Sequence, residues 1–338
     1  MSRIEFPHRM AAHCETGTIS GLLGFAGLKL SEPMVLGITG GIFFAYLKIR
    51  SLPFPTFVVR SAPGSILRNM AKRVKVGFHV TRFGNPDKAQ AALDSLLQQG
   101  VPPAVQVDMF YMDYIPAYMR VHFNGHFVTV IGKDGDTYTV SDCYHASLAT
   151  VPAEALRTAR FAKGDLAPKG TMFHVKDVPS NPDLRRPILE GLKHSCRNMV
   201  GLPVPFLGVK GMRKFAQKVV EWPKLTRDEV QLSHEIMNIN VILEERGTGG
   251  GGFRFMFASF LREASQVLGN ARLGEMGKEM MAIGDRWREL SIFAARTGKN
   301  RDFSDARMRE LQGLILARAD EEERFFKRLR DEVKGIRV

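Results

Sequence analysis

The chain contains little cysteine, with three residues among 338: Cys14, Cys143 and Cys196. An odd count without repeated spacing excludes a disulfide framework. A zinc site can be drawn from His13, Cys14, Cys143 and His145, because each end supplies a Cys/His pair. No paired C-x-x-C spacing supports that site, and we expect no bound metal.

Long apolar runs are also missing. The longest nearly apolar stretch, residues 34–47, is interrupted by glycines and is too short to span a bilayer. Residues 1–7 contain no apolar core of a signal peptide. We therefore expect a cytoplasmic protein with no membrane insertion.

The charge is strongly basic, but the composition is otherwise ordinary. The chain has 44% hydrophobic and 25% charged residues, as soluble globular proteins do, and it is long enough for two domains. A net charge of +13 fits nucleic acid, an anionic membrane surface or an acidic protein as partner. No nucleic-acid-binding motif is present and the basic residues are interspersed with acids, so we expect no nucleic-acid partner.

Cys14 stands where a helix is predicted to begin. Apolar residues recur at helical spacing over residues 16–25, and the polar residues Glu15, Thr16 and Thr18 suit a first turn. A thiol at a helix N-terminus experiences the positive end of the helix dipole, which favours the thiolate. The backbone N–H of the cysteine can also stabilise an oxyanion.

A hairpin more than a hundred residues later carries a histidine and an aspartate at matched ends. Apolar segments 127–131 and 138–140 flank Asp134-Gly135, a strong hairpin signal. Antiparallel pairing would bring His126 beside Asp142, which would fix the imidazole tautomer and leave one ring nitrogen to face a thiol. Taken singly, these residues are most often structural. Their conjunction, in the order Cys, His, Asp used by papain-like folds, favours catalysis.

Three further side chains are candidates for substrate binding, each with an alternative. Glu32 is expected either beneath the nucleophile helix or as a carboxylate in the first turn of its own helix. Asp108, at a strand end beside aromatic residues, would bind an amine or order a loop. The loop 247–252 lacks the context of a nucleotide-binding motif, but with Arg254 it would hold an anion, or else be a flexible turn.

Residues 179–182, Pro-Ser-Asn-Pro, are the best linker signal. They follow the last predicted strand and precede helices only. We therefore predict a first domain of residues 1–180 and a helical bundle domain of residues 181–338. The helices predicted in the second domain are 183–199, 209–222, 227–246, 253–268, 271–296 and 304–333.

Several short motifs resemble a known family. The N-terminal domain of the butirosin-biosynthesis protein H family is similar to His13–Thr16, Leu30–Glu32, Gly37–Tyr46, Val105–Tyr111 and His122–His126. Gly247–Arg254 resembles the helical domain of unknown function that often follows it.

The resemblance implies an α+β architecture: a papain-like, C39-peptidase-like domain adapted to acyl transfer, followed by an all-α domain. The founding member moves an aminoacyl group from an acyl carrier protein to an amine of an aminoglycoside. By position, Cys14 would be the nucleophile, His126 the general base and acid, and Asp142 the orienting carboxylate. Related peptidases place a Gln before the cysteine as an oxyanion donor. Only His8 and Arg9 lie there in this chain.

The predicted function is a cysteine-dependent acyltransferase of secondary metabolism. It would pass an acyl or aminoacyl group from an acyl carrier protein thioester to a small-molecule amine. The phosphopantetheine arm would come with the carrier, so we expect no cofactor in the chain itself. Two alternatives are an amidase, peptidase or thioesterase with the same triad, and a non-catalytic module that binds a carrier protein.

Overall fold

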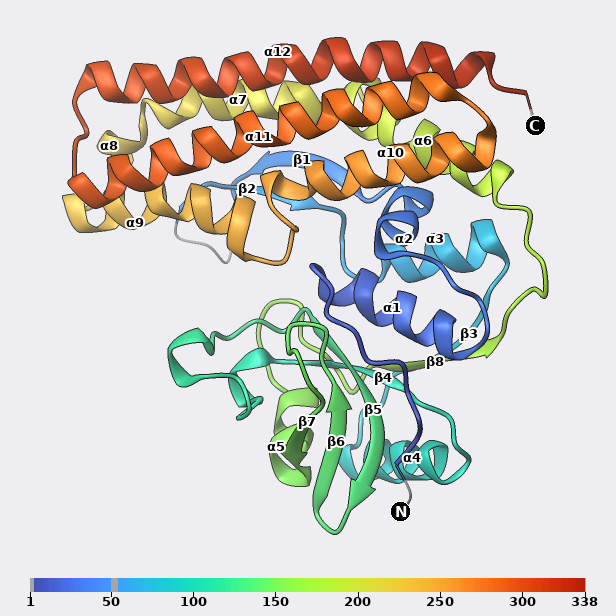
Figure 1. The fold of residues 1–338 in the computed structure, drawn as a ribbon. Helices are drawn as coiled ribbons and strands as arrows, with labels where there is room; N and C mark the ends of the chain where they lie inside the picture. Colours follow the sequence, from blue (N-terminus) through green and yellow to red (C-terminus); the bar gives the residue numbers. More distant parts are fainter. Residues whose placement is uncertain (1–2, 50–53, 338) are drawn as a thin grey trace. The chain divides into compact units, whose positions relative to one another are not determined.

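A computed structural model describes residues 3–49 and 54–337 (Figure 1). Helices and sheets are both present, as predicted for an α+β protein. The chain forms two units, and each is built from two separate segments. Unit 1 contains Met1–Val35 and Pro63–Pro182; unit 2 contains Leu36–Ala62 and Asp183–Val338.

Unit 1 is organised around a six-stranded sheet in which every neighbouring pair is antiparallel. The spatial order is β3-β8-β4-β5-β6-β7. The strands are β3 (Gly77–Thr81), β4 (Ala104–Val107), β5 (His126–Asp134), β6 (Thr137–Ser141), β7 (Ala149–Pro152) and β8 (Met172–Asp177).

Two helices of unit 1 share the main apolar core with the sheet. Leu93 of α4 and Leu156 of α5 are buried with Val128, Val130 and Val140. Val128 and Val130 are two residues apart and therefore point to the same face of β5. The helical elements of unit 1 are α1 (Cys14–Phe25), α3 (Ser65–Val74), α4 (Pro86–Gln98), α5 (Ala153–Arg160) and the 3₁₀ turns η1 (Met109–Tyr111) and η2 (Ala117–Met119).

The predicted hairpin is formed by β5 and β6. Asp134 pairs with Thr137 at the closed end, and Gly135 has φ of +53°, a value that glycine adopts without strain. The first residue of β5 and the residue after β6 consequently lie at the open end. These residues are His126 and Asp142.

Unit 2 is mainly helical, and each predicted helix has a counterpart in the structure. Two of them, at 183–199 and 227–246, end in a π-helical turn rather than a regular one. The elements are α6 (Arg185–Cys196), η3 (Arg197–Gly201), α7 (Gly208–Val219), α8 (Trp222–Leu225), α9 (Glu229–Asn240), η4 (Val241–Glu245), η5 (Gly251–Phe253), α10 (Arg254–Leu268), α11 (Ala271–Asn300) and α12 (Asp305–Gly335). Helix α2 (Glu32–Thr39) begins in unit 1 and ends in unit 2.

Unit 2 also contains a hairpin from the N-terminal half of the chain, β1 (Ile42–Leu47) and β2 (Thr56–Arg60). The predicted division placed these residues in a first domain of 1–180. Aromatic packing explains the difference. The rings of Phe44 and Phe57 stack with centroids 5.4 Å apart, and Phe57 lies 4.9 Å from Phe215 of α7. Phe44 also stacks on Trp287 of α11 at 6.2 Å. These helices therefore bury the hairpin.

The glycine-rich loop forms a left-handed turn that leads into α10. Five consecutive residues, Gly249 to Phe253, have positive φ, between 55° and 87°. Four of them are glycines, which adopt this conformation readily, whereas Phe253 does so at a steric cost. Phe253 is nevertheless buried, so packing holds it in place.

Among the described residues, no helix combines the length and apolar character that crossing a membrane requires.

Candidate active site

Cys14 begins α1, and one carboxylate holds the backbone just before it. Glu32 accepts hydrogen bonds from the N–H of Ala12 at 3.0 Å, the N–H of His13 at 2.8 Å and the hydroxyl of Thr16 at 2.8 Å. Burial raises the pKa of Glu32, although the bonds from Ala12 and His13 act against that rise. Glu32 therefore lies against α1 and fixes the position of Cys14. Its role as a substrate-binding residue stays a prediction.

The thiol of Cys14 is buried and lies at the start of β5. The residue is 1% exposed, and its Sγ donates a weak hydrogen bond to the carbonyl oxygen of Gly125 at 3.7 Å. Gly125 immediately precedes His126. As the first residue of a helix, Cys14 has a backbone N–H without an acceptor inside that helix. This N–H and the positive end of α1 are available to stabilise negative charge near the sulfur.

His126 and Asp142 form a fully buried pair. Nε2 of the imidazole donates to Oδ2 of Asp142 at 2.8 Å, and both side chains are 0% exposed. The proximity that the hairpin predicted is therefore present. The other ring nitrogen, Nδ1, is buried and has no hydrogen-bond partner among the described residues. Such a nitrogen is free to exchange a proton with a reacting group.

Asp142 sets the charge of the imidazole. Burial alone lowers the pKa of His126, but the negative charge and hydrogen bond of Asp142 outweigh it, and Cys14 acts in the same direction. The pKa of His126 is therefore raised. Burial raises the pKa of Asp142, but the positive charge of His126 outweighs that effect and lowers it. Asp142 therefore favours the protonated form of His126, and His126 favours the ionised form of Asp142.

Two tyrosines that the sequence analysis did not identify complete the surroundings of Asp142. The hydroxyl of Tyr114 donates to Oδ2 of Asp142 at 2.7 Å, and the backbone N–H of Tyr144 donates to Oδ1 at 3.0 Å. The ring of Tyr144 stacks on His126 with centroids 5.4 Å apart. Tyr144 could have been suspected from its place two residues after Asp142. Tyr114 carries no local signal, since it comes from a loop between β4 and β5.

Asp108 organises the loop that carries Tyr114. Its buried carboxylate accepts from the N–H of Phe110 at 3.1 Å, the N–H of Phe123 at 2.9 Å and Nδ1 of His122 at 2.8 Å. These bonds correspond to the loop-ordering alternative. They differ from the alternative prediction, in which Asp108 binds substrate, because both of its oxygens are already bonded inside the loop.

Arg254 lies in unit 2 and has no exposed surface. Its guanidinium donates to both carboxylate oxygens of Glu322, at 2.8 and 2.9 Å, and to the carbonyl of Gly252 at 2.6 Å. An amide of the neighbouring loop is also already hydrogen-bonded, since the N–H of Gly251 donates to the Glu244 carboxylate at 2.9 Å. The structure therefore differs from the predicted anion site. The buried carboxylate of Glu322 already pairs with Arg254, and the half-buried carboxylate of Glu244 accepts a hydrogen bond from a loop amide.

The residues before Cys14 supply no free histidine as an oxyanion donor. Nδ1 of His8 is 2.8 Å from the hydroxyl of Ser141, and Nε2 donates to the carbonyl of His145 at 3.0 Å. Both ring nitrogens are thus bonded, one to the last residue of β6 and the other to the segment that follows it. Arg9 is exposed and lines a cavity beside α1.

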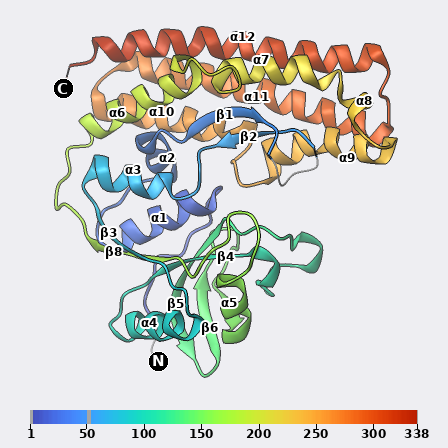
Figure 2. The same ribbon diagram turned by 180° about the vertical axis from the view of Figure 1, so that it is seen from behind.

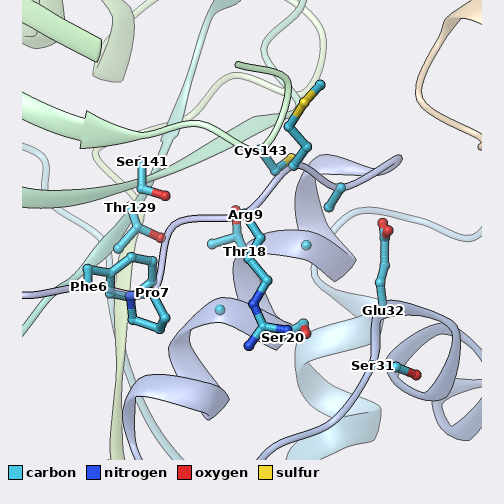
Figure 3. A pocket seen from close by; sticks show the side chains of 14 residues that line it. Phe6, Pro7, Arg9, Thr18, Ser20, Ser31, Glu32, Thr129, Ser141 and Cys143 are labelled. Carbon is cyan, nitrogen blue, oxygen red and sulfur yellow. The ribbon is translucent and has the colours of Figure 1, made fainter. Parts of the chain in front are cut away.

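That cavity has a volume of about 180 Å³ and lies beside α1 (Figure 3). Gly17 and Thr18 are three and four residues after Cys14, so they continue its helical face into the cavity wall. A Cβ at Gly17 would meet Ala11 at 2.4 Å, which explains the glycine. Cys14 does not line the cavity. The lining residues are Phe6, Pro7, Arg9, Met10, Ala11, Gly17, Thr18, Ser20, Gly21, Ser31, Glu32, Thr129, Ser141 and Cys143.

The zinc alternative finds no support in the described ranges, 3–49 and 54–337. They contain no cluster of three or more His, Cys, Asp or Glu side chains arranged to hold a metal ion. Cys143 is a buried thiol whose pKa is raised by burial and by the neighbouring charges of Cys14 and Asp142.

Two family models match the chain. Residues 13–143 match the model described as butirosin biosynthesis protein H, N-terminal, and residues 154–329, more than half of the chain, match a domain of unknown function, DUF4872. The chain belongs to the DUF4872 family, and its residues 13–143 are similar to the N-terminal domain of butirosin biosynthesis protein H. The DUF4872 match begins at residue 154, inside unit 1, so it does not coincide with the division between the units.

Other comparisons add little. A crystal structure of a C39-like peptidase from Bacillus anthracis is similar at 13% identity with a TM-score of 0.38, and the match covers 53% of this chain and all of that one. No curated protein matches this chain.

Proposed function

We propose that this chain is a cysteine-dependent acyltransferase. It would take an acyl or aminoacyl group from an acyl carrier protein thioester and pass it to an amine in a biosynthetic pathway. One observation carries the proposal: Asp142 holds the buried imidazole of His126 through Nε2, which leaves Nδ1 free, and the thiol of Cys14 lies against the carbonyl of the preceding residue, Gly125. The similarity of residues 13–143 to the N-terminal domain of butirosin biosynthesis protein H supports the biosynthetic context.

In the first step the thiolate of Cys14 attacks the carbonyl carbon of the carrier thioester. A new carbon–sulfur bond forms to Cys14, and the bond to the phosphopantetheine sulfur breaks. The departing thiolate takes the Nδ1 proton of His126, which leaves a neutral imidazole. The backbone N–H of Cys14 stabilises the oxyanion formed on the way.

In the second step the amine attacks the acyl-enzyme. A carbon–nitrogen bond forms, the bond to Cys14 breaks, and neutral His126 accepts the proton that the amine loses. The products are an amide and the original thiolate–imidazolium pair, so no external acid or base is consumed. Asp142 keeps Nε2 protonated throughout and thereby directs Nδ1 to the reaction.

Burial of the site supports transfer rather than hydrolysis. Cys14, His126 and Asp142 are each at most 1% exposed, and the ring of Tyr144 covers one face of the imidazole. Thioester exchange is nearly balanced in energy, so the enzyme's main task is to orient the reactants and keep water from the acyl-enzyme.

Intact-mass spectrometry tests the proposal. The protein is incubated with a carrier protein loaded with a set of acyl and aminoacyl groups, and we expect a covalent adduct that disappears on addition of an amine. Cys14→Ala should form none, whereas Cys196→Ser, which changes a buried thiol of unit 2, should form it normally. No adduct on the wild type, or an adduct on Cys14→Ala, would refute acyl transfer through Cys14.

Product analysis separates transfer from hydrolysis. With an amine present we expect an amide, and the free acid should form only slowly without it. Rapid release of the acid in the presence of amine would identify a hydrolase instead. Carrier binding without any turnover would identify a non-catalytic module.

A further inference from the structure

A stretch of thirty residues in unit 2 carries positive charge without any acid. Residues 191–220 contain six cations, Lys193, Arg197, Lys210, Arg213, Lys214 and Lys218, and neither Asp nor Glu. The basic residues of the chain are therefore not interspersed with acids everywhere. This stretch includes the end of α6, the π turn η3 and all of α7.

Four of these cations have no carboxylate beside them. Lys193, Arg197, Lys210 and Lys214 form no ion pair in the part of the chain that the structure describes, whereas Arg213 and Lys218 do. We call these four residues the basic face. Many other cations of unit 2 are neutralised, as Arg288 is by Glu244. Further ion pairs of unit 2 are Arg254–Glu322, Arg286–Glu321, Arg307–Glu310, Lys327–Glu323 and Lys334–Asp331.

Three of these four side chains are exposed, and Lys214 is half-buried. Lys210 and Lys214 are four residues apart, so they project from one side of α7, while Met212, Phe215 and Val219 are buried. Lys193 and Arg197 have the same spacing along α6 and η3, and both are exposed. Figure 2 shows α6 and α7 following one another along the near side of the helical unit.

An apolar side chain lies beside one of these cations. Phe206, just before α7, is 36% exposed, and the Nζ of Lys214 lies 5.9 Å from its ring centroid. Uncompensated charge around a partly exposed aromatic ring is typical of a surface that binds a protein of opposite charge. One such ring gives little to insert into a bilayer, which disfavours a membrane as the partner.

We infer that the basic face binds an acidic protein, and that this partner is the carrier protein of the acyl-transfer reaction. The inference rests on the proposed function for its choice of partner. The four cations would accelerate encounter with the acidic carrier and hold it by contacts that salt screens.

Binding of a holo acyl carrier protein, with its phosphopantetheine arm attached, tests the surface without any acyl group. For Lys210→Glu/Lys214→Glu we expect a Kd about tenfold higher than wild type at about 0.05 M salt. The difference should shrink at about 0.5 M salt, where the charges are screened. Lys88→Glu/Lys299→Glu makes the same change in charge at exposed positions outside the basic face and should bind as wild type does.

Two further variants show whether weaker binding comes from lost charge or from misfolding. Lys210→Gln/Lys214→Gln should weaken binding less than the reversal, and Lys193→Glu/Arg197→Glu should weaken it independently of α7. An unchanged Kd in both reversed variants overturns the inference. Equal weakening in the control pair also overturns it, as does preferential binding of phosphatidylglycerol vesicles or duplex DNA.

A kinetic comparison keeps this result separate from the proposed function. With a carrier-bound thioester, Lys210→Glu/Lys214→Glu should lower kcat/KM about tenfold. With the same acyl group on free pantetheine it should leave kcat/KM unchanged. Equal losses on both substrates overturn the docking surface, while absence of transfer by the wild type refutes the acyltransferase itself.

Discussion

Tyr114 donates a hydrogen bond to the same oxygen of Asp142 that accepts from His126, at 2.7 Å and 2.8 Å respectively. Two donors on one oxygen, with the N–H of Tyr144 on the other, keep the carboxylate ionised and fix its plane. Tyr114 is thus a positioning residue, acting on the imidazole through Asp142.

Replacing Tyr114 by Phe should weaken this arrangement. A hydrogen bond to a charged group is lost, so the free energy of unfolding should fall by about 2 kcal/mol in urea denaturation. Alkylation of Cys14 near neutral pH should also slow severalfold, because a less firmly held carboxylate supports the imidazolium less well. Tyr111 lies in the same loop, and its hydroxyl forms no hydrogen bond to any described residue. Tyr111→Phe should therefore change neither quantity.

The reactivity of Cys14 should depend on pH in an unusual way. Because the pKa of His126 is raised, its imidazolium should persist from about pH 6 to 8, and the rate at which iodoacetamide alkylates the wild type should change little over that range. Asp142→Asn removes the charge that holds the imidazolium. Its rate at about pH 6 should fall at least tenfold and then climb with pH. Identical profiles for the two proteins would show that Asp142 does not support the imidazolium.

The His126–Asp142 pair should also make the free energy of unfolding depend on pH. The folded pKa of His126 is raised, so its contribution is complete below about pH 6.5 and is lost as pH rises towards the folded value. The folded pKa of Asp142 is lowered, so its contribution is complete above about pH 4 and is lost as pH falls. The gap in unfolding free energy between wild type and Asp142→Asn should therefore be widest between about pH 4 and 6.5. A gap that is constant with pH would contradict this assignment.

Glu32 should matter for both folding and reactivity. Glu32→Ala leaves the N–H groups of Ala12 and His13 without their acceptor, which should cost about 3 kcal/mol and slow alkylation of Cys14. Thr16→Val removes only one of the three donors and should cost about 1 kcal/mol. Denaturation and alkylation measured on both variants check the order. A Glu32→Ala protein as stable as the wild type would be inconsistent with a backbone clamp.

Arg254 should behave as a structural residue. Arg254→Met leaves Glu322 buried and without its cation, which should destabilise the protein by about 3 to 5 kcal/mol. Arg254→Met/Glu322→Leu removes both charges and should recover part of that loss, although Trp287 then loses the acceptor of its Nε1–H. Alkylation of Cys14 should be unaffected in the double variant. A stable Arg254→Met protein with only a higher KM for thioester would instead indicate substrate contact.

The local part of the candidate site was predictable from the sequence. Polar residues ahead of an apolar helical pattern located the start of α1 at Cys14, and Asp134-Gly135 fixed the register that pairs His126 with Asp142. These features depend on residues close together in the chain, which is where sequence patterns are informative. The catalytic roles of the three residues stay a prediction.

What the sequence did not reveal depends on contacts between distant segments. Tyr114 reaches Asp142 from the loop between β4 and β5, and Asp108 orders that loop. Arg254 resembled a ligand-binding residue because its partner, Glu322, lies 68 residues away. Strand β7 was missed because it is four residues long and ends in a proline.

The placement of the β1–β2 hairpin has a practical consequence for dissecting this protein. A fragment that stops at Pro182 would retain Phe44 and Phe57 but lose Phe215 and Trp287, the rings against which they stack. Apolar surface released in this way drives aggregation. The complementary fragment would lack the hairpin and have a hole in its interior. A single cut in the gene cannot separate the two units into proteins that each keep their own core.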